Sequence, residues 1–188
     1  MSIKWGVLGT GGIAREFTED VITHTEMTIS AVGSRNLDKA NSFREGIKGF
    51  GSYEELVNSD VDAIYIATPH QAHCENTILA LNAGKPVLCE KPFAVNANEA
   101  KQMADAAKKN NLLLMEAMWT RFLPVQAAIQ DVIKSGQIGK VKIVVADHTR
   151  YLVDIRRLWD PELGGGALLD LGVYPLNFIV RLLGLPSK

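Results

Sequence analysis

Short apolar runs alternate with amphipathic stretches over the first two-thirds of the chain. The apolar runs are rich in Val, Ile and Leu and have the length of buried strands, which we expect at 3–8, 27–32, 46–50, 61–67, 86–89 and 112–116. The stretches between them place apolar residues three or four positions apart, which indicates helices at 13–22, 37–43, 53–57, 74–83 and 97–109. This alternation predicts an α/β fold with a doubly wound parallel sheet, because strands that are apolar throughout need helices on both faces.

A different pattern begins after about Trp119. The expected elements are a helix at 123–133, a strand at 140–149, a loop at 151–163 and a helix at 168–183. Apolar and polar residues alternate in the strand, as in a half-exposed strand of a more open sheet. We therefore predict two domains, at 1–119 and 120–188.

The composition narrows the range of partners. The chain has 188 residues, of which 20 are Lys or Arg and 21 are Asp or Glu, for a net charge of −1. Without a basic surplus, neither nucleic acid nor an anionic membrane is an expected partner, so a small molecule is favoured. The N-terminus enters a strand at once, without an export signal, so we expect a cytoplasmic protein with Cys74 and Cys89 as reduced thiols.

A glycine-rich loop lies between the first strand and the first helix. Its residues are Gly9, Thr10, Gly11, Gly12, Ile13 and Ala14, a G-x-G-x-x-A pattern. In this position the first glycine permits a tight turn, the second lets the backbone approach a pyrophosphate, and the alanine allows close packing of helix and strand. The helix N-terminus then offers free N–H groups to phosphates. The loop therefore predicts a Rossmann dinucleotide site, with a glycine turn that binds nothing as the alternative.

The end of the second strand bears on the choice of dinucleotide. An NAD site would carry an acidic residue there for the ribose hydroxyls, whereas this chain has Ser34 and Arg35, with Lys39 one helical turn further on. A hydroxyl and a guanidinium suit a 2′-phosphate, and arginine can also stack on adenine. We predict NADP as the cofactor, with NAD as the alternative. If Arg35 is only a solvated loop residue, it gives no reason to prefer NADP to NAD.

A cluster of His70, His73, Cys74 and Glu75 invites a metal hypothesis. These residues straddle a strand end and a helix start, where the spacing of known zinc sites does not fit. We therefore predict no metal site, and we expect no role for His24 and His148.

Further motifs carry a resemblance. Glu90-Lys91-Pro92 follows one predicted strand, and the sequence Ala-Thr-Pro-His at 67–70 follows the strand before it. Together with the glycine loop, they closely resemble the Gfo/Idh/MocA family of glucose–fructose oxidoreductases and inositol dehydrogenases. The stretches 115–122 and 164–175 look most like its branch of dimeric dihydrodiol dehydrogenases and NADP-dependent D-xylose dehydrogenases.

The resemblance implies an NADP-dependent oxidoreductase that transfers hydride between the nicotinamide and a sugar, polyol or trans-dihydrodiol. It implies that Lys91 reaches the nicotinamide and substrate, and that Tyr174 takes the acid/base position. The residues it implies at the nicotinamide ribose are Thr68, Pro69, His70 and Glu90, and we assign His73 to the same cofactor group. The residues it implies on the nicotinamide and substrate side are Trp119, Arg121 and Arg157.

The chemistry of alcohol oxidation agrees with these roles. The reaction needs a base for the hydroxyl proton, and a free tyrosine, with a pKa of about 10, is too weak. A neighbouring ammonium such as that of Lys91 would lower that pKa. Asp170 lies four residues before Tyr174, on the same face of a helix, where it could bind a substrate hydroxyl or orient Lys91. From the residues alone, Lys91 would be a surface lysine and Tyr174 a core tyrosine.

The resemblance also bears on the second domain, which in the family is a large, mostly antiparallel sheet that covers the active site and builds the dimer. We expect this chain to carry only the beginning of that α+β domain and to form a homo-oligomer. A non-catalytic NADP(H)-binding fragment or regulatory module is the alternative to an active dehydrogenase, and a Rossmann-like domain without a ligand is a third hypothesis.

Overall fold

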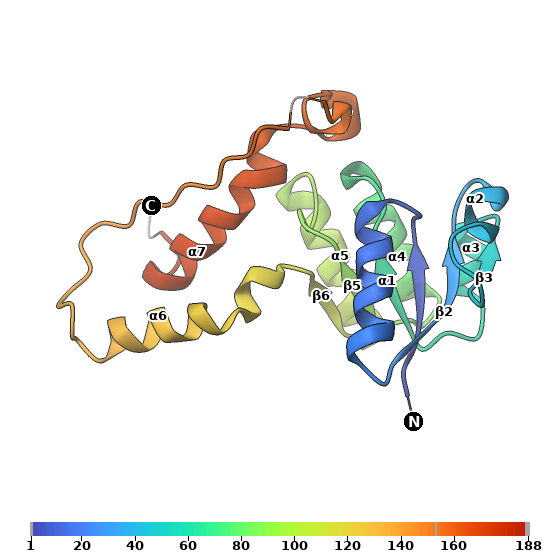
Figure 1. Cartoon of the computed structure of the whole chain (residues 1–188), viewed down its shortest axis with the longest axis horizontal. Coiled ribbons are helices and arrows are strands. Elements are labelled where there is room, and N and C mark those ends of the chain that lie inside the picture. Colours follow the sequence, from blue (N-terminus) through green and yellow to red (C-terminus); the bar gives the residue numbers. More distant parts are fainter. Residues whose placement is uncertain (1, 153, 187–188) are drawn as a thin grey trace. The chain divides into compact units, whose positions relative to one another are not determined.

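A computed structural model describes residues 2–152 and 154–186, except the side chains of Arg157 and Glu162. The chain divides into two compact units, Met1–Ala117 and Met118–Lys188 (Figure 1). We describe each unit by itself.

The first unit is built on a six-stranded parallel sheet. Its strands are β1 (Lys4–Leu8), β2 (Thr28–Gly33), β3 (Lys48–Phe50), β4 (Ala63–Ile66), β5 (Val87–Cys89) and β6 (Leu114–Glu116). The strand order is β3-β2-β1-β4-β5-β6, so the winding reverses beside β1, which pairs with both β2 and β4. The predicted doubly wound parallel sheet is confirmed, and ligands of such sheets bind at the carboxyl ends of the strands where the order reverses.

Helices cover both faces of the sheet. They are α1 (Gly12–His24), α2 (Leu37–Asn41), α3 (Tyr53–Val57), α4 (His73–Asn82) and α5 (Ala97–Asn110). One buried cluster joins the sheet to α1 and α2, and the other joins it to α3, α4 and α5. Neighbouring residues of β4 belong to opposite clusters, Tyr65 to the first and Ile64 and Ile66 to the second, because side chains alternate across a strand.

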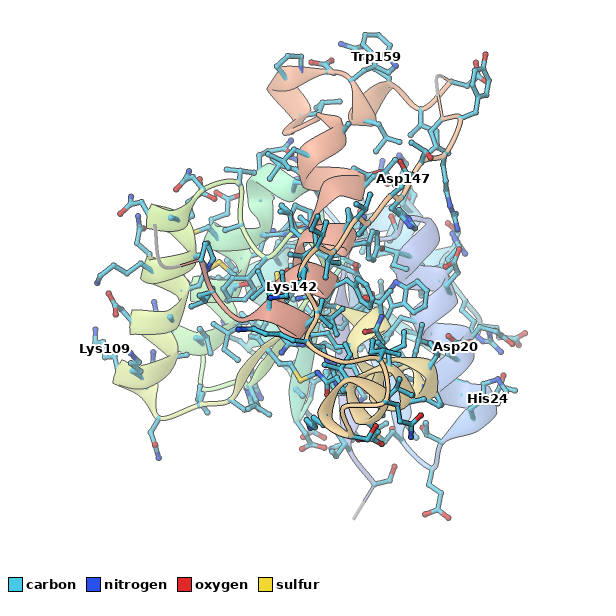
Figure 2. The ribbon with its side chains drawn as sticks, turned by 90° about the vertical axis from the view of Figure 1, so that its left-hand side faces the viewer. Asp20, His24, Lys109, Lys142, Asp147 and Trp159 are labelled. Carbon is cyan, nitrogen blue, oxygen red and sulfur yellow. The ribbon has the colours of Figure 1, made fainter. Side chains whose placement is uncertain are left out.

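Side chains fix the helix ends. Asn36, Ser52 and Asn96 each accept an N–H from the residue three positions on, which caps α2, α3 and α5. Lys109 lies at the C-terminal end of α5, where a cation favours the helix dipole, and Figure 2 shows its side chain pointing away from the ribbon. These local signals explain why the predicted helices begin close to where the structure has them.

The second unit is less regular. Its elements are the short turns η2 (Trp119–Phe122), η3 (Arg156–Leu158) and η4 (Pro161–Leu163), the π-helical turn η5 (Leu168–Gly172), and the helices α6 (Pro124–Lys134) and α7 (Val173–Leu183). The strand predicted at 140–149 is wrong: these residues form no ladder, and Ile143 and Val145 are 80 % and 88 % exposed. Alternation alone does not make a strand, because its N–H and C=O groups need a neighbour, and the described chain supplies none. Among the described residues, no helix is long and apolar enough to span a bilayer.

Candidate cofactor site

The glycine loop follows β1 at the point where the sheet order reverses. Gly9 has φ +112°, and its N–H donates to the Gly33 carbonyl at 3.0 Å. A Cβ at Gly9 would lie 2.5 Å from the Ala67 carbonyl oxygen, so no other residue fits without moving the backbone. The loop is thus held between the ends of β2 and β4.

Beyond Gly9 the loop opens. Gly11 is the N-cap of α1, and a Cβ on Gly11 or Gly12 would meet nothing within 4 Å. The first turn of α1 contains no acidic residue, and no side chain caps it in the described chain. Thr10 is half-buried, Ile13 is exposed, and Ala14 is fully buried against the sheet. The free N–H groups and the positive dipole end can therefore receive an anion.

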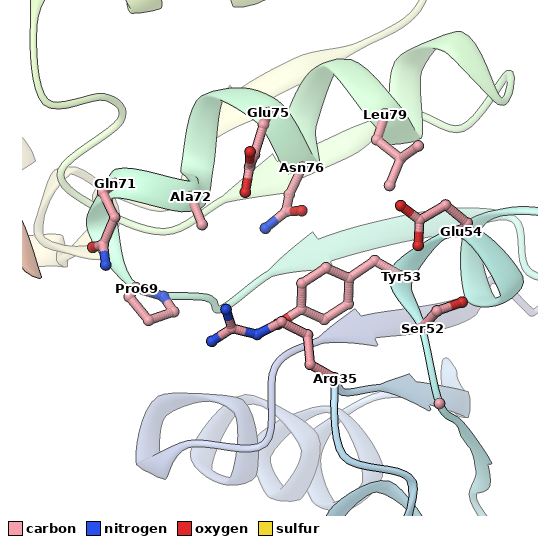
Figure 3. Close-up of a pocket in the computed structure, with 11 residues that line it drawn as sticks. Arg35, Ser52, Tyr53, Glu54, Pro69, Gln71, Ala72, Glu75, Asn76 and Leu79 are labelled. Carbon is pink, nitrogen blue, oxygen red and sulfur yellow. The ribbon is translucent and has the colours of Figure 1, made fainter.

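A pocket of about 530 Å³ lies at the carboxyl ends of β2, β3 and β4. Figure 3 shows the Arg35 guanidinium reaching across it from the end of β2. The lining residues are Arg35, Gly51, Ser52, Tyr53, Glu54, Pro69, Gln71, Ala72, Glu75, Asn76 and Leu79. Its size is that of a small-molecule site. Arg35, one of the three residues predicted near a 2′-phosphate, and Pro69 are thus brought into one cavity.

Tyr53 is a lining residue that the sequence did not single out. Burial raises the pKa of its phenol, and the Arg35 guanidinium beside it opposes that rise. The available signal was its position directly after the Ser52 cap, at the same sheet edge as the glycine loop. Ser34, by contrast, is buried and its Oγ accepts the Asn36 N–H at 3.2 Å, and neither Ser34 nor Lys39 lines the pocket.

A side chain of α4 holds the loop that follows β4. Thr68 is buried, and its Oγ1 accepts a hydrogen bond from Asn76 Nδ2 at 3.1 Å. His70 is also buried, in the short turn that leads into α4. Their predicted contact with the nicotinamide ribose stays a prediction.

His73 is fully buried, and its two ring nitrogens bridge two loops. Nδ1 lies 2.8 Å from the Pro92 carbonyl oxygen and Nε2 lies 2.9 Å from that of Thr68. Both carbonyls accept only, so the charged imidazolium satisfies both while the neutral ring satisfies one. Burial nevertheless lowers the pKa of His73, against the effect of the two carbonyls. Its predicted cofactor role can act only through the loops that it joins.

The Glu-Lys-Pro motif follows β5. The Glu90 carboxyl is buried, with Oε1 accepting from the Tyr65 hydroxyl at 2.5 Å and Oε2 accepting from the Lys91 N–H at 3.1 Å. Burial raises the pKa of Glu90, and these two hydrogen bonds oppose the rise. Lys91 is half-buried at the same sheet edge as the glycine loop.

The remaining predicted residues belong to the second unit. Trp119 Nε1 donates to the Tyr174 hydroxyl at 3.3 Å, and the His148 ring centroid lies 4.7 Å from that of Tyr174. His148 thus contacts a predicted site residue, and the expectation that it has no role stays a prediction. Asp170 is buried in the π-helical turn, so the spacing of an α-helix does not describe its path to Tyr174.

Arg121 and Arg157 are the two arginines of this unit that were predicted on the nicotinamide and substrate side. The Arg121 carbonyl accepts from Arg181 Nη1 at 2.6 Å, and Arg121 is exposed. The side chain of Arg157 lies outside the described part of the chain. The approach of Lys91, in the first unit, to Tyr174 and Asp170, in the second, stays a prediction.

In the described residues, no three His, Cys, Asp or Glu side chains are grouped to hold a metal ion. His73 faces backbone carbonyls, and the Cys74 Sγ lies 3.7 Å from the Glu99 carbonyl oxygen. Of the residues that invited the metal hypothesis, His73 and Cys74 thus have carbonyl partners, and Glu75 lines the pocket with Arg35.

Two protein-family models match the chain. Residues 3–118 match the oxidoreductase family with an NAD-binding Rossmann fold, and residues 126–188 match the GFO/IDH/MocA C-terminal domain. Together they extend over nearly all of the sequence.

Individual relatives agree with these matches. A D-xylose 1-dehydrogenase (NADP(+)) of Hypocrea jecorina is 39 % identical over 97 % of this chain and 53 % of its own length. A bovine trans-1,2-dihydrobenzene-1,2-diol dehydrogenase is 40 % identical over 98 % of this chain and 57 % of its own length. The crystal structure of a 3-ketoreductase from Actinomadura kijaniata in complex with NADP has a TM-score of 0.85 and 32 % identity, over 98 % of this chain and 56 % of that one. The chain thus spans little more than half the length of these relatives.

Proposed function

The chain belongs to the Gfo/Idh/MocA oxidoreductase family, and on that premise we propose that it binds NADP(H) and transfers hydride between the nicotinamide and a sugar, polyol or trans-dihydrodiol. We propose a substrate among these classes because the relatives' names include a pentose and a dihydrodiol. The two free, buried thiols, Cys74 and Cys89, are consistent with the cytoplasmic location that the sequence predicts.

One observation supports the cofactor proposal: α1 begins without a side-chain cap directly after β1, and the pocket that contains Arg35 lies at the ends of the neighbouring strands β2 and β4. The open space over Gly11 at the start of α1 fits a pyrophosphate. The pocket with Arg35 and Tyr53 fits the adenosine end, with the guanidinium as the partner of a 2′-phosphate. Because the strand ends run on from there to Lys91, the nicotinamide end would face the Glu-Lys-Pro motif.

The proposed mechanism gives each of three side chains a separate role. NADP, when bound, supplies the ring carbon that accepts the hydride. Tyr174 takes the substrate hydroxyl proton, and the Lys91 ammonium stabilises the phenolate that makes this possible. Asp170 orients either the substrate hydroxyl or Lys91. The meeting of these three residues at one substrate is part of the proposal.

We also propose that the second unit, which we place at 120–188, contributes to the substrate side and to a homo-oligomer. Apolar side chains of this unit are exposed, including Val125 at 55 % and Ile143 at 80 %. Exposed apolar surface of this kind suits burial by further polypeptide.

Tyr174→Phe tests the catalytic part of the proposal. Loss of the base is expected to reduce NADP-linked oxidation of D-xylose or a trans-dihydrodiol by about 10²- to 10⁴-fold, with NADPH binding retained. Tyr151→Phe, in an 86 % exposed tyrosine of the same unit, is the matched control and should keep full turnover. Unchanged turnover in Tyr174→Phe would remove Tyr174 from the mechanism. Tight NADPH binding with no turnover by the unmodified chain would favour the non-catalytic binding module instead.

A further inference from the structure

Tyr65 is a buried phenol in the middle of the sheet, and the proposed mechanism does not use it. It is 2 % exposed on β4, between Val7 of β1 and Leu88 of β5 in register. Its ring stacks on Phe17 of α1, with the centroids 3.8 Å apart and the planes 20° apart, and Phe17 packs edge-on against Trp5. The ring is therefore fixed from the helix side, and with it the position of the hydroxyl oxygen.

That hydroxyl points to Glu90. The Tyr65 O–H donates to Glu90 Oε1 at 2.5 Å, while the Lys91 N–H donates to Glu90 Oε2 at 3.1 Å. The Glu90 backbone is also fixed, because its N–H donates to the Ile66 carbonyl at 3.0 Å. The two carboxyl oxygens thus accept from different donors: Oε1 from the buried Tyr65 hydroxyl, and Oε2 from the backbone N–H of Lys91.

The arrangement makes Glu90 a link between the sheet and Lys91. A buried carboxyl is costly unless hydrogen bonds compensate for the lost water, and Tyr65 supplies such a bond from inside the sheet. Without the phenol, the carboxyl would be free to rotate toward other donors or toward solvent, and the Lys91 N–H would lose its acceptor. The backbone that bears the Lys91 side chain would then be less well fixed.

We propose that Tyr65 is a positioning residue for Lys91: through the Glu90 carboxyl it fixes the backbone that carries the Lys91 ammonium at the nicotinamide end of the site. The assignment of that end rests on the proposed function. The link from Tyr65 through Glu90 to the Lys91 N–H rests on the first unit alone.

Amide hydrogen exchange of Lys91, followed by NMR on the full chain without cofactor, tests the link directly. Tyr65→Phe keeps the ring and its stacking on Phe17 but removes the donor, so the Lys91 amide is expected to exchange about tenfold faster. Amides in the centre of β4 should keep their slow exchange, which separates a local effect from general loosening. Thr18→Val is the matched control, because it removes another buried hydroxyl, one with no partner among the described residues.

A double-mutant cycle with Glu90→Ala separates positioning from simple packing. If Tyr65 acts through Glu90, Lys91 exchanges as fast in the double variant as in Glu90→Ala alone, since the second change has no carboxyl left to act on. Unchanged Lys91 exchange in Tyr65→Phe, or effects of the two variants that add, would overturn the proposal. Because exchange is measured without NADP, failure of cofactor binding would refute the proposed function and leave this test standing.

Discussion

Replacing Gly11 by alanine separates ligand binding from folding at the glycine loop. The added Cβ meets nothing within 4 Å, and the backbone of Gly11, at φ −74° and ψ −176°, is open to alanine. The cost to folding is therefore limited to a poorer N-cap, less than about 1 kcal/mol. The same methyl group would stand over the N-terminus of α1, where the pyrophosphate is expected to accept hydrogen bonds.

The size of the binding loss follows from those hydrogen bonds. Each one to a charged phosphate contributes about 1.5–3 kcal/mol, so losing one weakens NADPH binding by roughly 10- to 150-fold. Urea unfolding and a fluorescence titration with NADPH measure the two quantities on the same variant. Gly9→Ala is the control with the opposite profile: its Cβ would lie 2.5 Å from the Ala67 carbonyl oxygen at φ +112°, which should destabilise the fold by at least about 2 kcal/mol. Gly11→Ala with full NADPH affinity would refute the placement of the pyrophosphate.

Three other perturbations test separate parts of the first unit. Arg35→Ala should weaken NADPH binding by about tenfold and leave NADH binding almost unchanged, as competitive titrations would measure; equal losses would argue against a 2′-phosphate site. The free energy of unfolding should decrease as pH falls through about 6.5, because buried His73 binds fewer protons in the folded protein than in the unfolded chain. In urea titrations from pH 5 to pH 8, His73→Gln should lack that part of the pH dependence. Burial raises the pKa of Cys89 to about 12, so an aromatic disulfide reagent should modify it at pH 8 only in urea, and rapid modification of the native protein would contradict its burial.

The sequence predicted the first unit well because its signals are local. Each predicted strand and helix before residue 117 has a counterpart in the structure. A Cβ at Gly9 would clash with the backbone, as expected of a tight turn, whereas a Cβ at Gly11 would meet open space, as expected where the backbone approaches a ligand. Arg35 was predicted as a cofactor residue from its position after β2, and in the structure it lines the pocket.

Features that depend on distant partners could not be predicted in this way. The alternating segment at 140–149 needed a neighbouring strand, which the described chain does not provide. Tyr65, Glu90 and Lys91 form their link across two strands, and the two carbonyl partners of His73 lie 5 and 19 residues away along the chain. The periodicity of apolar residues along the sequence does not predict such contacts.

Isothermal titration calorimetry of the full chain with NADPH and with NADH tests the central claim most directly. The account predicts saturable binding of both, with NADPH tighter by at least about tenfold because of the guanidinium beside the adenosine pocket. The absence of heat from either nucleotide at millimolar concentration, or tighter binding of NADH, would contradict it.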